Sequence, residues 1–178
     1  MLKPMENYGL KVMSMGFLVA EDTPMIWRGP MVISALNQML REVAWGELDM
    51  LVVDMTPQDL ALIDARKGLN MFNKVNVPVL GIVENMSYFI CPDCGGRHDI
   101  FGHGGARAEA ARINVPFLGE VPLAMTIRET SDAGLPVVAT AADGPHAKAY
   151  RDIADNVLAQ LDALSGEGAR TMPDIVFE

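Results

Sequence analysis

The stretch Asn76-Val-Pro-Val-Leu-Gly-Ile-Val83 is apolar almost throughout, and we predict a strand over 77–83. A related stretch, Asn114-Val-Pro-Phe-Leu-Gly119, follows later in the chain. Both come where a helical pattern ends and a strand pattern begins. A short apolar run that returns from a helix is typical of a buried strand in a parallel sheet. We interpret the repeated pattern as the shared punctuation of successive βαβ units rather than as a duplication.

Strand and helix patterns alternate on both sides of these two stretches. The predicted strands are Lys11–Val19, Asp49–Asp54, Val77–Val83 and Val115–Val121. The predicted helices open at Gly29-Pro30, at Thr56, at Gly105, at a capping box Thr126-Ile-Arg-Glu129, and at Pro145, from which the last one runs to Leu164. This alternation predicts an α/β fold, with a mostly parallel sheet covered by helices on both faces.

Length and composition set the remaining bounds. The chain has 178 residues, half of them hydrophobic, which predicts a single domain over 1–164 followed by a loose tail over 165–178. The formal net charge of −9 argues against a nucleic-acid partner. No apolar run approaches the roughly 20 residues of a membrane span, and the first residues lack the layout of a signal peptide. We therefore predict no membrane partner and a cytoplasmic location.

The stretch from Cys91 to Gly105 carries the clearest chemistry. It contains both cysteines of the chain, two residues apart in a tight turn, followed by His98 and His103. Two thiolates at this spacing bind zinc or the iron of a cluster but supply only half of a tetrahedral site. The histidines would complete a site within one chain, or else they are an exposed loop residue and a residue at a helix N-terminus. A structural zinc knuckle and a plain reduced pair are the other interpretations.

Ligands of parallel sheets bind beyond the carboxyl ends of the strands. Asp54, Asn85 and the cysteine loop all follow predicted strands, so polar side chains collect on that edge. Asp54 is a candidate catalytic acid there, although an acid at this place also caps a turn. Asn85 is a candidate ligand-binding residue, although asparagine often satisfies loop backbone.

Several long motifs follow one another in the order of a known family. They are Met25-Ile-Trp-Arg-Gly-Pro30, Leu51-Val-Val-Asp54, Thr56 to Gly68, Gly81-Ile-Val-Glu-Asn-Met-Ser87, the cysteine loop, Gly119-Glu-Val-Pro-Leu123 and Ile127-Arg-Glu-Thr-Ser-Asp132. In these the chain resembles the Mrp family of iron–sulfur cluster carrier ATPases, which belongs to the same P-loop NTPase group as the MinD and ParA partition proteins. The resemblance extends from about Asn7 to the last helix.

This resemblance implies a homodimer that holds a 4Fe-4S cluster between subunits, bound by Cys91 and Cys94 of each chain. It also implies binding and hydrolysis of ATP with magnesium. Asp54 matches the family's Walker B acid, and Asn85 and Pro122 match the residues that frame the adenine. Iron–sulfur apo-proteins would receive the cluster. The alternative is a non-enzymatic dimerisation module, in which zinc occupies the same thiolates.

Two departures from the family pattern matter. The family begins with a P-loop, Lys-Gly-Gly-Val-Gly-Lys-Ser/Thr, and no such segment occurs here. Because phosphate binding needs a glycine-rich turn and a lysine, we expect the chain to bind nucleotide poorly. In addition, Met55 runs directly into Thr56, where the family has a switch loop, a helix and a strand. Our hypothesis is that these residues are part of a longer protein. A P-loop unit and a switch segment of that protein would be missing from this sequence.

Overall fold

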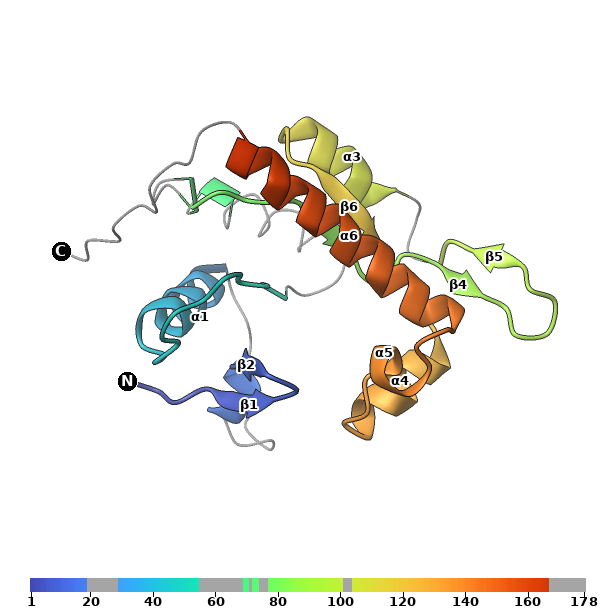
Figure 1. Cartoon of the computed structure of the whole chain (residues 1–178), viewed down its shortest axis with the longest axis horizontal. Coiled ribbons are helices and arrows are strands. Elements are labelled where there is room, and N and C mark those ends of the chain that lie inside the picture. Colours follow the sequence, from blue (N-terminus) through green and yellow to red (C-terminus); the bar gives the residue numbers. More distant parts are fainter. Residues whose placement is uncertain (19–28, 55–68, 71, 74–76, 101–103, 167–178) are drawn as a thin grey trace. The chain divides into compact units, whose positions relative to one another are not determined.

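The computed structural model describes the chain except for residues 19–28, 55–68, 71, 74–76, 101–103 and 167–178 (Figure 1). The chain divides into two compact units, Met1–Asp54 and Met55–Glu178. The helix expected at Thr56, the Met55–Thr56 junction and His103 lie outside the described residues. The domain boundary predicted at residue 164 stays a prediction.

The first unit begins with an antiparallel hairpin, which the sequence reading missed. Strand β1 (Met5–Asn7) pairs with β2 (Leu10–Val12), and Asn7 lies opposite Leu10. The two loop residues, Tyr8 and Gly9, both have positive φ angles, as tight hairpin loops require. The strand expected over 11–19 is therefore wrong beyond β2. A 3-10 helix, η1 (Met15–Phe17), follows instead, because the Ser14 side chain accepts a hydrogen bond from the Gly16 N–H.

Helix α1 (Gly29–Arg41) confirms the helix predicted to open at Gly29-Pro30. After it, Val43 pairs with Leu2 in a parallel bridge and is only 3% exposed. The strand expected over 49–54 is wrong, because these residues are irregular and Val52 is 83% exposed. An apolar run becomes a strand only when a neighbouring strand completes its hydrogen bonds. In the described part of this unit, β1 and β2 pair with each other, so they do not complete the hydrogen bonds of residues 49–54.

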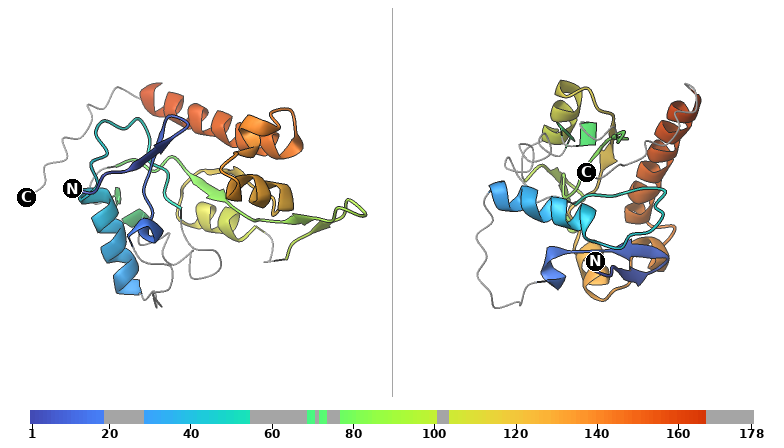
Figure 2. Two further views of the ribbon diagram at one scale, coloured as in Figure 1. Left: turned by 90° about the horizontal axis from the view of Figure 1, so that it is seen from below. Right: turned by 90° about the vertical axis from the view of Figure 1, so that its left-hand side faces the viewer.

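The second unit is an α/β arrangement built around a parallel strand pair. Strands β3 (Ile82–Glu84) and β6 (Phe117–Glu120) are hydrogen-bonded in parallel. Helices α3 (Gly105–Arg112) and α6 (Pro145–Gly166) pack against them, and β6 lies between these helices in the right-hand view of Figure 2. The strand expected over 77–83 is shorter than predicted. It begins only at Ile82, whose N–H donates to the Pro116 carbonyl oxygen.

The repeated pattern at 76 and 114 ends each time in a glycine that permits close packing. A Cβ on Gly81 would lie 2.4 Å from the Leu118 Cγ and 2.7 Å from the Pro116 carbonyl oxygen. A Cβ on Gly119 would lie 2.7 Å from the Ile153 Cγ1 on α6. The glycines therefore let β3 approach β6, and β6 approach α6, within the same small core.

Three elements of the second unit were missed, and one cap was wrong. Strands β4 (Phe89–Ile90) and β5 (Arg97–His98) form a hairpin around the cysteines, and α5 (Val137–Thr140) is a single helical turn. Helix α4 (Met125–Asp132) begins after Ala124, which makes no side-chain cap. Thr126 thus lies inside the helix, and the predicted capping box does not form.

The last helix continues two residues past its predicted end, to Gly166, and the rest of the expected tail lies outside the described residues. Within the described ranges, no helix combines the length and the apolar character needed to cross a bilayer.

Candidate functional site

The two cysteines lie in the turn of the β4–β5 hairpin. The Cys91 N–H donates to the Gly96 carbonyl oxygen at 2.9 Å, and the Gly95 N–H donates back to the Cys91 carbonyl oxygen at 2.9 Å. Gly95 has a φ of 69°, which glycine adopts without strain. The Cys-Pro-Asp-Cys-Gly-Gly sequence therefore closes a tight turn that presents both thiols from one short segment.

Both cysteines are free thiols, with Cys94 exposed and Cys91 half-buried. The backbone N–H of Cys94 lowers the pKa of Cys91 below its ordinary value, and the backbone N–H of Asp93 and the Cys94 thiol lower it further. Hydrogen bonds that favour the charged form of a thiol make it a better nucleophile and a better metal ligand near neutral pH. The turn thus prepares Cys91 for binding a soft cation.

We expect Cys91 to react with iodoacetamide at lower pH in the folded protein than in urea. Because the folded pKa is lowered, the thiolate fraction is larger near neutral pH, and the rate falls only when the pH drops through this lowered pKa. Alkylation at a series of pH values, followed by fragment-ion mass spectrometry, resolves Cys91 from Cys94. A folded midpoint equal to or above the one in urea would contradict the assignment of the shift to the turn.

Gly96 lets the second thiol pack closely against the backbone of the turn. A Cβ at Gly96 would lie 3.2 Å from the Cys94 Sγ and 3.5 Å from the His98 Nε2. A larger residue at this position would therefore crowd the Cys94 thiol. Among the described residues, no three His, Cys, Asp or Glu side chains gather as a metal-binding group. What the described part of the hairpin offers is a pair of thiols.

The two predicted nucleotide-binding residues lie on neighbouring chain segments. Asn85 follows β3, Pro122 follows β6, and the Val121 N–H donates to the Glu84 carbonyl oxygen at 2.8 Å. The side chain of Asn85 is exposed, and its Oδ1 accepts from the Met86 N–H at 3.0 Å, whereas Pro122 is buried. The carboxyl ends of the two parallel strands therefore bring these residues to one edge. Asp54 is an exposed residue at the end of the first unit, and its catalytic role stays a prediction.

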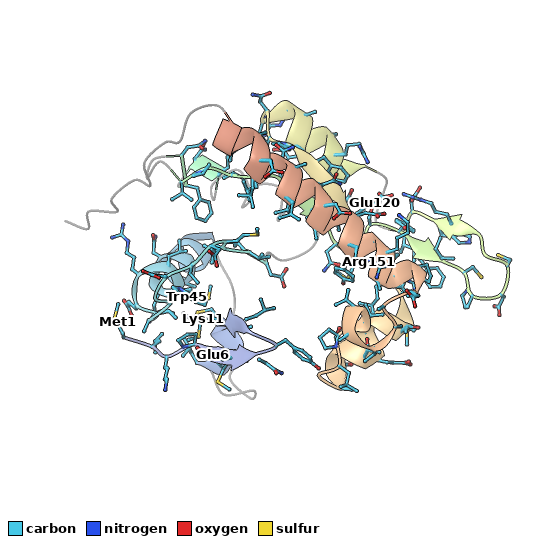
Figure 3. The ribbon with its side chains drawn as sticks, viewed as in Figure 1. Met1, Glu6, Lys11, Trp45, Glu120 and Arg151 are labelled. Carbon is cyan, nitrogen blue, oxygen red and sulfur yellow. The ribbon has the colours of Figure 1, made fainter. Side chains whose placement is uncertain are left out.

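Sequence reasoning missed the polar contacts that hold the hairpin. Arg97 on β5 forms a 3.0 Å ion pair with Glu120 at the end of β6, and Glu120 also accepts a 3.0 Å hydrogen bond from Ser87. Figure 3 shows Glu120 between β6 and the hairpin. The hydrogen bond to Glu120 is the largest cause that raises the pKa of Arg97. The sequence offered one signal for the hairpin, the Cys-Pro-Asp-Cys-Gly-Gly turn with two strand residues on either side. The residue that forms the ion pair with the hairpin is distant in sequence, so no local pattern indicates it.

A parallel strand pair with helices packed against it, and polar residues at the carboxyl ends of its strands, agrees with a P-loop NTPase-like α/β fold, and a family match assigns the chain to that class. The sequence model of a protein family described as "ParA: NUBPL iron-transfer P-loop NTPase" matches residues 1–57 and 55–158. The chain belongs to this family.

Curated relatives agree with this membership. The chain is 48% identical over 188 residues to "Iron-sulfur cluster transfer protein NUBPL" of Dictyostelium discoideum, with 92% of the chain and 58% of the relative covered. It is 41% identical to "Iron-sulfur cluster carrier protein" of Pyrococcus horikoshii, with 90% and 62% covered. It is 45% identical to the protein of the same name in Escherichia coli K12, with 90% and 50% covered.

A solved nucleotide-binding protein from Archaeoglobus fulgidus, in complex with ADP, is 31% identical, with 74% of the chain and 60% of that chain covered and a TM-score of 0.45. The chain thus spans between half and about three fifths of the length of these proteins.

The family match is divided into two stretches at the place where the sequence predicts the missing segment. The two stretches matched by the family meet at residues 55–57. The match to the Dictyostelium protein extends over 188 residues, which is more than the 178 of the whole chain. The relative therefore contains residues that have no counterpart here. The break in the family match falls at the Met55–Thr56 junction, whereas the length of the second match shows only that residues of the relative are lacking in this chain. The missing segment between Met55 and Thr56 stays a hypothesis.

Proposed function

We propose that this protein is an ATP-dependent iron–sulfur cluster carrier that binds a 4Fe-4S cluster between the two subunits of a homodimer. The observation that carries the proposal is the Cys91–Cys94 turn with its two free thiols. A 4Fe-4S cluster takes four thiolate ligands, and two copies of this turn supply four. The names of the relatives, carrier and transfer proteins for iron–sulfur clusters, support the same cargo.

The donor set suits this cargo. Thiolates are the ligands that iron–sulfur clusters take, and the backbone N–H groups of the turn favour the charged form of Cys91. The Cys94 thiol is exposed at the surface. A cluster that is bound at an exposed turn is accessible to a second protein. We therefore propose iron–sulfur apo-proteins as recipients, and a cytoplasmic location stays part of the prediction.

The test is anaerobic reconstitution with iron and sulfide, followed by native mass spectrometry. We expect a brown dimer with about four iron atoms. A monomer that carries cluster iron would contradict binding between subunits. Stoichiometric zinc that iron does not displace would instead support the zinc-stabilised dimerisation module, since zinc takes the same tetrahedral thiolates.

The nucleotide part of the proposal rests on Asn85, Pro122 and Asp54. Asn85 and Pro122 would border the adenine from the ends of β3 and β6, and Asp54 would act with magnesium at the phosphates. ATP, when bound, would supply the free energy of phosphoryl transfer for a conformational step. The residues of a glycine-rich phosphate turn are not among the 178, so they would lie outside this sequence.

We therefore expect these 178 residues to bind ATP weakly, with no preference for ATP over AMP. Without a glycine-rich turn and its lysine, the β- and γ-phosphates gain no contacts that AMP lacks. Isothermal titration with Mg-ATP and with AMP, in parallel, measures this difference. Saturable binding of ATP that is clearly tighter than binding of AMP would show a phosphate site in this chain and contradict the expectation.

A further inference from the structure

The carboxylate of Glu120 contacts two residues, Ser87 and Arg97, that lie 33 and 23 positions before it in the chain. Its Oε1 forms a 3.0 Å ion pair with the Arg97 Nη1, and its Oε2 accepts a 3.0 Å hydrogen bond from the Ser87 hydroxyl. The Glu120 side chain is 26% exposed, so solvent screens it only in part. One residue at the end of β6 therefore contacts both the segment that follows β3 and the cysteine hairpin.

Ser87, one of the two partners of Glu120, is fixed by burial and by a backbone hydrogen bond. Ser87 is 3% exposed, and its N–H donates to the Val121 carbonyl oxygen at 2.9 Å. It lies two residues after Asn85, while Val121 directly precedes Pro122. The next residue pair continues the contact, because the Leu123 N–H donates to the Tyr88 carbonyl oxygen at 2.7 Å. Ser87 thus lies in the hydrogen-bonded backbone segment that positions Asn85 and Pro122, the residues proposed to border the adenine.

The Arg97 side belongs to the hairpin. Arg97 is opposite Ile90 in the β4–β5 ladder, and Gly96, which directly precedes it, accepts the Cys91 N–H. The Arg97 guanidinium carbon lies 3.9 Å from the centroid of the Tyr88 ring, and its Nε is 3.1 Å from Asp99. A guanidinium that stacks on a ring and pairs with a carboxylate has a defined orientation. A shift of Arg97 therefore moves the residue that closes the thiol turn.

We propose that Glu120 is a positioning residue, which links the cysteine hairpin through Arg97 to the strand ends through Ser87 and so sets how firmly the thiols hold their cargo. The inference rests on the proposed function for its cargo, but the link itself is a property of the protein without cluster or nucleotide. A displacement of the strand ends would reach the thiols through this carboxylate and two hydrogen-bonded neighbours.

The first test uses the cluster-free protein. We expect Arg97→Met to speed amide hydrogen exchange of Cys91 and Gly95 by about three- to tenfold, because the hairpin loses its ion pair with the sheet. The matched control is Arg128→Met, which removes a 3.6 Å ion pair with Asp132 on α4. It should leave the exchange of the hairpin unchanged. Equal exchange in both variants would overturn the link.

Ser87→Ala tests whether Glu120 connects two segments or merely holds one. Among the described residues, the Ser87 hydroxyl donates to Glu120, which in turn pairs with Arg97 of the hairpin, so a link predicts faster exchange of Cys91 in this variant as well, in the same direction as in Arg97→Met. Unchanged exchange in Ser87→Ala, with faster exchange in Arg97→Met, would show that Glu120 anchors the hairpin alone and would overturn the relay. Unchanged exchange of α6 amides shows that each variant is folded.

The second test uses protein reconstituted with iron and sulfide. We expect Arg97→Met to release iron to bathophenanthroline disulfonate about three- to tenfold faster than the wild type, at equal initial iron content. Arg97→Lys keeps the charge and should restore most of the slow release. Equal release from Arg97→Met and Arg128→Met would overturn the inference. A wild-type protein that takes up no cluster contradicts the proposed function instead, while the exchange experiment still decides the link.

Discussion

Replacement of Cys91 by serine is expected to abolish cluster uptake. In a dimer the change leaves two of the four thiolates, and the serine hydroxyl stays protonated at neutral pH, where it is a poor ligand for cluster iron. After anaerobic reconstitution, the iron content should fall from about four atoms per dimer to nearly none, with loss of the visible absorbance. Cys94→Ser should have the same effect.

The control for this experiment is His98→Ala. His98 lies on β5 of the same hairpin, and its Nε2 is near Gly96 beside the Cys94 thiol. If two turns supply all four ligands, this variant keeps its full iron content and its spectrum. Loss of the cluster in His98→Ala would show that the histidine is a ligand. Retention of iron in Cys91→Ser would contradict the proposed site.

Gly81→Ala is expected to destabilise the protein. The new Cβ would lie 2.4 Å from the Leu118 Cγ and 2.7 Å from the Pro116 carbonyl oxygen, and a backbone atom yields only by moving β6. Overpacking of this kind costs about 1–3 kcal/mol. Alanine also restricts the unfolded chain, which offsets about 0.4–1 kcal/mol. Because the clash is the larger effect, thermal unfolding should begin several degrees lower.

Gly105→Ala is the matched control, since it adds the same methyl group in open space. No atom lies within 4 Å of a Cβ at Gly105, which is the first residue of α3. Alanine is the better helix former, so this variant should be as stable as the wild type or more stable. Differential scanning calorimetry of both variants makes the comparison. Equal melting temperatures for the two would contradict the close contact of Gly81 with β6.

The sequence predicted those elements whose apolar residues form a clear pattern within a short stretch of chain, such as one face of a helix or a buried strand. Helix α6 follows its long apolar stripe, and α3 and β6 lie within a residue or two of their expected bounds. The resemblance located the family, and the spacing of the two cysteines predicted the tight turn. These features depend on residues that are near one another in the chain, which is why pattern and spacing reveal them.

The failures have two physical causes, pairing with distant residues and an unusual residue in a turn. The run at 49–54 has the composition of a buried strand, yet it is irregular, because a strand requires a partner that its own residues do not specify. The β1–β2 hairpin was missed because Tyr8 is an unusual residue for a positive φ. Glu120 was treated only as part of a family motif, since its contacts with Ser87 and Arg97 join residues distant in sequence. Long-range pairing of this kind is visible only in three dimensions.

The ladder that carries the thiols consists of two residue pairs, Phe89 with His98 and Ile90 with Arg97, and in Figure 1 it extends away from β6. So short a ladder frays at a free energy well below that of whole-domain unfolding. Under the proposed function, unloading would require only this fraying, while the core of β6 and α6 stays intact. After release, the protein would bind a new cluster without having to refold, as a carrier that acts repeatedly requires.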